Sequence, residues 1–577
     1  MPAFWPRRLC HFPQHLLAPS RREHSFARPR ISVKVTMTHF SPKTTLSDEE
    51  FAQAVRALEA IRGGMDVLTA IKRHPLRRGL LSKGALVAAY RRLVAEGAWE
   101  EDPDLLARIR LKPVRSLSGV TVVTVLTKPY PCPGECIFCP DDTRMPKSYL
   151  PDEPGAQRAL RHAFDPYAQV RSRLEALEAV GHPTDKIELL VLGGTWTAYP
   201  LEYREWFIRR LFDALNADDC PAAWRREGEC RAPSLAAAQR HNETARHRNV
   251  GLVVETRPDH INPRVLRRLR EFGVTKVQVG FQSMDDRILA LNKRGHTVAD
   301  NLRAAALLRA AGFKIVAHWM PNLYGATPES DRQDFARLWQ GLCPDELKIY
   351  PTQLLPNTEL YKIWESGGYT PYTTEQLIDL LADLKATVPP YCRINRVVRD
   401  IPSTHVVAGN KRTSLRQDVL AEMERRGTRC RCIRCREVRG EPVRPELLHL
   451  EDFTYQAAYA EEHFLQFVTP DDRLAGFLRL SLPRPEAPDV GLEDLAGAAI
   501  IREVHVYGQS LPVGAAQEGA AQHIGLGTRL LEEADRIARS AGFRKIAVIS
   551  AVGTRQYYLH RGFTRGELYL VKRLAQG

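Results

Sequence analysis

The chain has 577 residues, of which 44% are hydrophobic and 26% are charged. This length exceeds one ordinary domain and the apolar content excludes a disordered chain, so we expect two or three packed domains. The net charge of +15 favours a polyanionic partner such as nucleic acid, although charge alone does not identify one. The sequence contains no apolar run long enough for a membrane span and no signal-peptide core, so we expect no membrane association and a cytoplasmic location.

The first 110 residues fall into two parts. Residues 1–40 are rich in arginine, proline and histidine, and they are either an organelle transit peptide or a disordered extension upstream of a true start at Met37. We favour the second interpretation. Residues 46–110 show apolar side chains at helical spacing and predict a helical region. A basic run between Lys72 and Arg92 is either a solvated helix face or a nucleic-acid-contacting surface.

Residues 111–405 alternate between β-branched runs and helical stretches. The expected strands are 120–126, 187–192, 251–255, 276–280, 314–319 and 347–350. The expected helices are 203–215, 263–272, 298–311, 328–341 and 374–386. Six such alternations predict an α/β fold with a parallel sheet, either doubly wound or curled into a partial barrel. Active residues would then lie at the carboxyl ends of the strands.

The last part of the chain predicts a linker and a second domain. Residues 406–445, rich in arginine and cysteine, are expected to form a linker. In residues 446–577 the expected strands are 446–453, 464–468, 474–482, 498–507, 545–550 and one near Leu568, with a helix opening near Gly527. Antiparallel strands around one long helix predict an α+β domain.

A C-x3-C-x2-C loop formed by Cys132, Cys136 and Cys139 follows the first expected strand. Three thiolates in one short loop can hold three irons of a 4Fe-4S cluster and leave the fourth iron open. An open iron can chelate S-adenosylmethionine, and one electron from the cluster then cleaves the sulfonium to an adenosyl radical. The alternative is a zinc knuckle with a distant fourth ligand. Phe138 and the position at a strand end favour iron.

Gly193 and Gly194 end the second expected strand. Residues without a side chain let the backbone approach a ligand closely and expose carbonyls to an ammonium group. Alone, the pair indicates only a turn. Placed one strand after the cysteine loop, it resembles the glycine motif that binds the amino group of S-adenosylmethionine in radical-SAM proteins.

A glycine-rich stretch opens the C-terminal helix, and its backbone N–H groups could bind the pyrophosphate of coenzyme A. The pattern resembles the Gcn5-related acetyltransferase fold, in which a tyrosine hydroxyl can lie near the thioester sulfur. Core packing is the alternative for either tyrosine of this region, and their division of roles stays open. The candidate catalytic residues are Tyr557 and Tyr558, and the candidate cofactor-binding residues here are Gln522, His523, Ile524, Gly525, Leu526, Gly527, Thr528 and Tyr558.

A second cysteine group, Cys430, Cys432 and Cys435, lies among arginines that favour the thiolate. We expect a structural zinc, with reduced thiols as the alternative; no histidine follows at finger spacing, so the fourth ligand stays open. Two tight clusters indicate metal binding rather than a disulfide framework. The isolated cysteines are expected as core or surface thiols, one of which could complete a metal site: Cys10, Cys220, Cys230, Cys343 and Cys392.

In this order, the motifs resemble the catalytic subunit of Elongator, a tRNA wobble-uridine carboxymethylating enzyme that also exists as a single chain in archaea and some bacteria. The resemblance runs from about residue 46 to the C-terminus. The stretches that carry it are 122–139, 254–259, 291–297, 318–322, 348–351, 399–402 and 553–558. It implies a partial (β/α)6 radical-SAM barrel, an N-terminal helical region that contacts tRNA, and a C-terminal Gcn5-related acetyltransferase domain.

The resemblance also implies a reaction. An adenosyl radical abstracts hydrogen from the acetyl methyl of acetyl-CoA, the carbon radical adds to C5 of uridine 34, and hydrolysis leaves 5-carboxymethyluridine. Both sites must then face one cavity. The implied partners are the tRNA anticodon stem-loop and an electron donor, with a homodimer as an open assembly state. Two alternatives are a protein lysine acetyltransferase and a non-catalytic tRNA-binding scaffold. Neither function would use the cysteine loop.

Overall fold

The computed structural model describes residues 45–113, 116, 118–439, 443–507 and 525–575. These residues all belong to one unit, Pro42–Gly577. The expected N-terminal extension at residues 1–40 lies outside the described residues, as do Gln522, His523 and Ile524 of the expected cofactor site. Among the described residues no helix is both long and apolar enough to cross a membrane.

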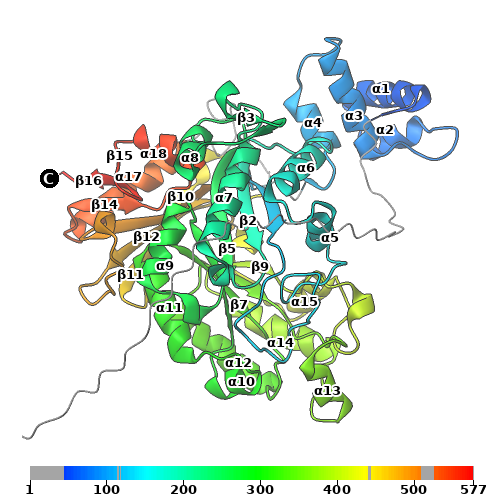
Figure 1. Cartoon of the computed structure of the whole chain (residues 1–577). Coiled ribbons are helices and arrows are strands. Elements are labelled where there is room, and N and C mark those ends of the chain that lie inside the picture. Colours follow the sequence, from blue (N-terminus) through cyan, green and yellow to red (C-terminus); the bar gives the residue numbers. More distant parts are fainter. Residues whose placement is uncertain (1–44, 114–115, 117, 440–442, 508–524, 576–577) are drawn as a thin grey trace, which may run out of the picture. The chain divides into compact units, whose positions relative to one another are not determined.

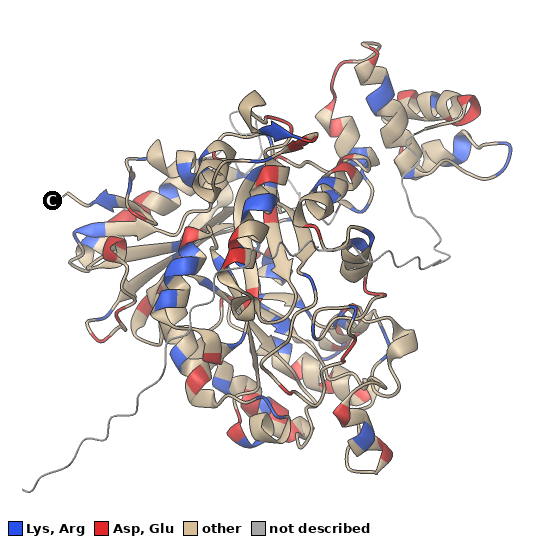
Figure 2. Cartoon of the chain, in the orientation of Figure 1, with Lys and Arg blue, Asp and Glu red and all other residues tan. Residues whose placement is uncertain are grey.

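The predicted N-terminal helical region is present. Its helices are α1 (Asp48–Arg62), α2 (Val67–Arg73), α3 (Lys83–Ala95) and α4 (Pro103–Ile109). They bury an apolar core of their own that includes Leu58, Ile61 and Leu86. Ser47 caps α1 in a box with Glu50, which satisfies two free N–H groups at the helix start. Lysine and arginine residues lie at the end of α2 and on the loop to α3 (Figure 2).

A seven-stranded parallel sheet forms the centre of the chain. Its strands, in spatial order, are β1 (Thr121–Leu126), β2 (Lys186–Leu192), β5 (Arg248–Thr256), β6 (Lys276–Gln282), β7 (Lys314–Trp319), β8 (Glu346–Ile349) and β9 (Arg393–Arg396). The pairing is sequential and parallel throughout, and the sheet curls into the predicted partial barrel. The six expected strands are confirmed. β9 was missed because its four residues, two of them arginines, show no β-branched run.

Helices cover the outer face of this sheet (Figure 1). They include α6 (Pro166–Glu178), α7 (Leu201–Leu215), α9 (Pro263–Glu271), α11 (Val298–Ala310), α12 (Pro328–Arg337) and α14 (Thr374–Ala386). Shorter helices are α5 (Pro154–Arg161), α8 (Leu235–Asn242), α10 (Asp286–Leu291) and α13 (Glu359–Glu365). Because the helices pack outside, the inward side chains of the strands are left to line a cavity.

Two cysteines expected as isolated thiols form a disulfide. Cys220 and Cys230 are bonded, with their Cα atoms 5.8 Å apart, beside the hairpin of β3 (Arg225–Arg226) and β4 (Glu229–Cys230). The expectation of two thiols was therefore wrong: the turn brings together residues whose spacing shows no cluster. Cys343 and Cys392 are free and buried, as expected for core thiols.

The stretch expected as a linker is folded against the barrel. It contains α15 (Leu415–Arg425) and the short α16 (Ile433–Arg436). Three apolar residues on one face of α15 are buried: Leu415, Val419 and Met423. The backbone N–H of Ile433 donates to the carbonyl of Cys392 at 3.0 Å. The second cysteine group is thus held in a fixed place by the barrel.

The C-terminal residues form a seven-stranded mixed sheet, an α+β arrangement as predicted. Its strands, in spatial order, are β10 (His449–Ala457), β11 (Ala460–Val468), β12 (Leu474–Pro483), β13 (Ala499–Val506), β14 (Lys545–Val548), β16 (Leu570–Arg573) and β15 (Thr564–Arg565). Its helices are α17 (Leu526–Ser540) and α18 (Arg555–Leu559). The expectation of purely antiparallel strands was wrong at one pair. β13 and β14 run parallel because the connection through α17 is a crossover.

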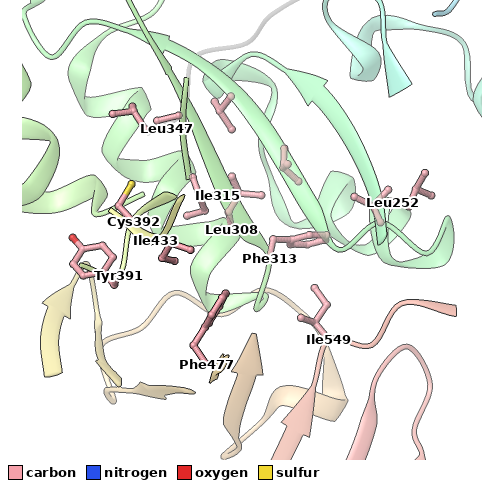
Figure 3. Packing of buried hydrophobic residues seen from close by; sticks show 14 of the residues in the cluster. Leu252, Leu308, Phe313, Ile315, Leu347, Tyr391, Cys392, Ile433, Phe477 and Ile549 are labelled. Carbon is pink, nitrogen blue, oxygen red and sulfur yellow. The ribbon is translucent and has the colours of Figure 1, made fainter. Parts of the chain in front are cut away.

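One continuous core joins the two sheets. Figure 3 shows Phe313 on the side of the parallel sheet and Phe477 and Ile549 on the side of the mixed sheet. Gly312 has φ +75°, and a Cβ there would come within 2.9 Å of Ile500, so only glycine fits.

Buried charges also cross the boundary between the sheets. The fully buried guanidinium of Arg502 donates to Asp345 at 2.6 Å and to Glu462 at 2.7 Å. Lys314 at the start of β7 pairs with Glu503 of β13 at 3.1 Å. Such pairs are costly to break because the remaining charge would be left buried and uncompensated. The mixed sheet is therefore held against the amino ends of the barrel strands.

Candidate functional site

A cavity of about 1510 Å³ lies inside the barrel. On β6, alternate residues line it, as the two-residue period requires: Lys276, Gln278, Gly280 and Gln282. The cavity is lined by the cysteine loop, residues 132–139, and also by residues of the mixed sheet. The expectation of one cavity shared by both sites is met. The lining extends along the strands, so it is not confined to their carboxyl ends.

The cysteine loop carries two neighbouring guanidiniums. Arg294 donates through Nη1 to the sulfur of Cys136 at 2.9 Å and through Nη2 to the carbonyl of Gly280 at 2.6 Å. The pKa of Cys136 is lowered to about 5, mainly by a hydrogen bond from the Cys139 thiol and further by Arg294 and Arg257. The loop therefore favours thiolate at Cys136, the form that binds metal.

These residues fit an iron–sulfur cluster. The buried Nη1 of Arg257 has no hydrogen-bond partner and lies against Gly134, where a Cβ would clash with it. The sulfurs of the three loop cysteines do not all lie within 4.8 Å of one another, so they do not form a site for one ion. Two guanidiniums can balance the negative charge of such a group. Cys132 and Cys139 remain partly exposed to the cavity.

The two candidate glycines differ in their reason for lacking a side chain. Both have positive φ, +144° at Gly193 and +86° at Gly194. A Cβ on Gly193 would clash with the hydroxyl of Thr127, so packing within the barrel explains this glycine. Gly194 lines the cavity beside Thr195, whose hydroxyl lies 3.6 Å from the sulfur of Cys132. Of the pair, Gly194 is the one placed to contact a ligand.

The start of α17 forms part of the cavity wall near the mixed sheet. Gly525 caps the helix with φ +73° and Gly527 follows in its first turn. A Cβ on Gly527 would come within 2.5 Å of the Tyr557 hydroxyl, so this glycine lets the tyrosine reach the helix start. Thr528 accepts a hydrogen bond from Arg561 at 3.3 Å, and the Arg561 guanidinium lies 3.7 Å from the Tyr557 ring centroid. Leu526 is buried and faces the core.

The two candidate tyrosines occupy different environments. Tyr557 is half-buried, whereas Tyr558 is 7% exposed and packs edge-on against Phe563. Burial raises the pKa of both hydroxyls. Both line the cavity. Tyr557 lies at the cavity wall beside Gly527 and the Arg561 cation, whereas Tyr558 packs largely in the core.

The second cysteine group is tighter than the first. Among the described residues, Cys430, Cys432 and Cys435 have sulfurs that all lie within 4.8 Å of one another, so one ion can contact all three. Lys385 of α14 is completely buried, its Nζ has no hydrogen-bond partner, and its charge acts on all three sulfurs. A buried cation facing three thiols fits a site that binds them as thiolates. These donors suit zinc.

Several cavity residues were given no role by the sequence. They are Arg257, Arg294, Glu255, His318 and Lys348, all inside stretches that carried the family resemblance. A usable signal was present, because Glu255, His318 and Lys348 interrupt runs that otherwise predict buried strands. A charged residue inside such a run needs a buried partner or a ligand. Which neighbours it meets depends on the strand order.

The comparisons with known proteins agree with this geometry. Residues 130–338 match the model of the Radical SAM superfamily, and residues 344–425 match the Radical_SAM C-terminal domain. These matches agree with the curled parallel sheet and with the three-cysteine loop at a strand end. The chain is therefore an enzyme of the radical SAM class. Members of this class use a 4Fe-4S cluster and S-adenosylmethionine.

Individual relatives cover most of the chain. A tRNA uridine(34) acetyltransferase of Dehalococcoides mccartyi is 42% identical over 80% of this chain and 99% of that protein. Elongator complex protein 3 of Danio rerio is 39% identical over 82% of this chain and 87% of that protein. The solved structure of archaeal Elp3 from Methanocaldococcus infernus has a TM-score of 0.66 at 37% identity, covering 79% of this chain and 99% of that one. The chain belongs to the family of tRNA uridine(34) acetyltransferases and Elongator complex protein 3.

Proposed function

We propose that this chain makes 5-carboxymethyluridine at the wobble position of tRNA, with acetyl-CoA as the source of the added group. Family membership supports the tRNA substrate. The observation that carries the reaction is the shared cavity, which is lined by the cysteine loop and by Gly525, Gly527, Thr528 and Tyr557. A radical formed beside the loop can meet an acetyl group only if both substrates reach one enclosed space.

Cys132, Cys136 and Cys139 would hold the 4Fe-4S cluster, with Arg257 and Arg294 balancing its charge. When bound, the cluster and S-adenosylmethionine supply a 5′-deoxyadenosyl radical. The backbone of Gly194 would accept the amino group of S-adenosylmethionine, because this glycine lines the cavity next to Cys132 through Thr195. The surrounding barrel would limit the access of bulk water to the radical.

Acetyl-CoA would bind at the start of α17. The N–H groups of residues 525–528 suit the pyrophosphate, and Arg561 adds a cation beside Thr528. Of the two tyrosines we assign the contact with the thioester to Tyr557, because it is half-buried at the cavity wall while Tyr558 packs in the core. Gln522, His523 and Ile524 would complete this loop.

Two further sites belong to the proposal. Cys430, Cys432 and Cys435 would hold a structural zinc that braces the barrel against the mixed sheet. The exposed basic residues between Arg73 and Lys83 would contact phosphates of the anticodon arm. Reversing their charges should weaken tRNA binding for all anticodons and leave S-adenosylmethionine cleavage intact; undiminished tRNA affinity would refute this contact.

Mass spectrometry of nucleosides tests the proposed function. Anaerobically reconstituted protein is incubated with tRNA, acetyl-CoA and S-adenosylmethionine, with and without a one-electron reductant. We expect carboxymethyluridine only with the reductant, together with 5′-deoxyadenosine. A protein lysine acetyltransferase would instead transfer acetyl groups to a histone-type peptide equally well without the reductant. That result would replace the proposal.

A further inference from the structure

A layer of four polar side chains crosses the inside of the barrel. Glu255 of β5, Gln278 of β6, His318 of β7 and Lys348 of β8 all point inward and line the cavity. Each is at least partly enclosed, and Gln278, His318 and Lys348 are less than 10% exposed. These four residues, called the polar layer below, belong neither to the cysteine loop nor to the start of α17.

The polar layer lies between the two ends of the cavity. Gly280, whose carbonyl binds Arg294 of the cysteine site, is two residues beyond Gln278 on the same face of β6, about 7 Å away at the usual rise of a strand. Lys276, two residues before Gln278, pairs with Glu188 at 2.8 Å and Glu346 at 2.7 Å. Beyond that pairing, Lys314 contacts Glu503 of the mixed sheet. An acyl group extended from the mixed sheet to the cysteine loop must pass the polar layer.

The hydrogen bonds of the polar layer determine which of its atoms carry a hydrogen and which accept one. Oε1 of Gln278 accepts from Nζ of Lys348 at 2.5 Å and from Nε2 of His318 at 2.9 Å. Because the lysine ammonium can only donate, the atom between these two groups must be the amide oxygen. Nε2 of His318 therefore carries its hydrogen, and Nδ1 keeps a free lone pair. Burial and Lys348 hold the pKa of His318 well below its usual range, so the ring stays neutral.

The carboxylate of Glu255 provides a second hydrogen-bond acceptor near Nδ1 of His318. Its Oε2 accepts from the Tyr149 hydroxyl at 2.8 Å, and its Oε1 lies 3.8 Å from Nδ1 of His318. This distance is too long for a direct hydrogen bond, but one water molecule can donate a proton to each acceptor. Such a water would turn its own lone pairs toward the cavity. Burial raises the pKa of Glu255, which makes it a stronger base than an ordinary carboxylate.

We propose that the polar layer is a second catalytic centre, which hydrolyses the thioester that joins coenzyme A to the newly formed carboxymethyl group. This inference rests on the proposed function. The water held by Glu255 and His318 attacks the thioester carbonyl carbon and loses a proton to Glu255. The Lys348 ammonium stabilises the oxyanion. The C–S bond then breaks, and the proton held by Glu255 passes to the coenzyme A sulfur, which leaves as a free thiol. The carboxylic acid that remains releases its own proton to solvent and becomes a carboxylate.

The test uses two substitutions that keep side-chain size, Glu255→Gln and His318→Gln, in the full-length reconstituted enzyme. After a single turnover the tRNA is digested and analysed for carboxymethyluridine and for uridine still linked to coenzyme A. 5′-Deoxyadenosine is measured in the same samples. His449→Gln, at an exposed site on β10, is the matched control. Iron content and melting temperature establish that each variant is folded.

We expect both variants to form 5′-deoxyadenosine, to accumulate the coenzyme A-linked uridine, and to release carboxymethyluridine at least about 100-fold more slowly, as for loss of a general base. Product at the wild-type rate would overturn the proposal. Loss of 5′-deoxyadenosine without any linked uridine would assign the polar layer to binding S-adenosylmethionine instead.

A failure of the proposed function gives a different result. The wild-type enzyme would then form 5′-deoxyadenosine but neither modified uridine. The polar layer is still tested in that case by thiol release from acetyl-CoA itself, followed with a thiol reagent. Release that depends on Glu255 and His318 supports the hydrolytic centre. Equal release by wild type and Glu255→Gln, or none by either, overturns it.

Discussion

The two cysteine groups have the same number of thiols but different environments. Cys132, Cys136 and Cys139 open onto the cavity beside two arginines, and their three sulfurs do not all lie within 4.8 Å of one another. Cys430, Cys432 and Cys435 converge within that distance outside the cavity, facing a buried lysine. The comparison teaches that the count of thiolates does not select the metal. We expect the metal to be selected by the spacing of the sulfurs, their access from the cavity and the nearby cations.

The largest expected effect comes from removing one thiol of the cavity group. Cys136→Ala should abolish the brown absorption at about 400 nm and all cleavage of S-adenosylmethionine, because three thiolates are the minimum that holds the cluster. Zinc content should not change. Absorption spectroscopy, 5′-deoxyadenosine analysis and metal analysis check this. If the chromophore and the cleavage survive, the radical assignment is wrong.

The matching change in the second group is Cys432→Ser. We expect loss of zinc and a lower melting temperature, since metal binding to such a site contributes to folding free energy. The iron content of reconstituted protein should stay at the wild-type level. Elemental analysis and thermal unfolding measure both outcomes. Unchanged zinc would refute a metal at this group.

A smaller effect is expected at Lys385. Three thiolates and one zinc would carry a net charge of −1, which the buried ammonium would balance. Lys385→Met should weaken zinc binding by roughly 10- to 100-fold, the range for residues that support a ligand set. Competition with a chromogenic chelator measures this, with Lys411→Met at an exposed site as the control. Tighter zinc binding in Lys385→Met would mean that the lysine opposes the metal.

The smallest effect concerns the hydrogen bond from Arg294 to Cys136. Hydrogen bonds to cluster sulfurs raise the reduction potential, so Arg294→Met should lower the potential while the cluster still assembles. A spectroscopic redox titration measures the shift, and zinc content serves as an internal control. A potential equal to that of the wild type would show that Arg294 acts only in packing.

The local features of this protein are predictable from its amino-acid sequence. Six barrel strands follow from β-branched runs and helical periodicity, because these patterns depend on near neighbours in the chain. Both cysteine groups follow from spacing alone. The glycines 193, 194, 525 and 527 were also found, although the reason for Gly193, its contact with Thr127, was not.

Which distant residues meet is set by the packing of the folded chain. Three features join segments through turns or crossovers, which the periodicity of the sequence does not predict. They are the addition of β9, the parallel pairing of β13 with β14 and the Cys220–Cys230 disulfide. The same holds for Lys385 at the second cysteine group and for the polar layer, whose members come from four strands. A charged residue inside an apolar strand indicates that a buried partner or a ligand is needed. The order and register of the strands determine which partner it finds, because those are set by the packing of the whole barrel.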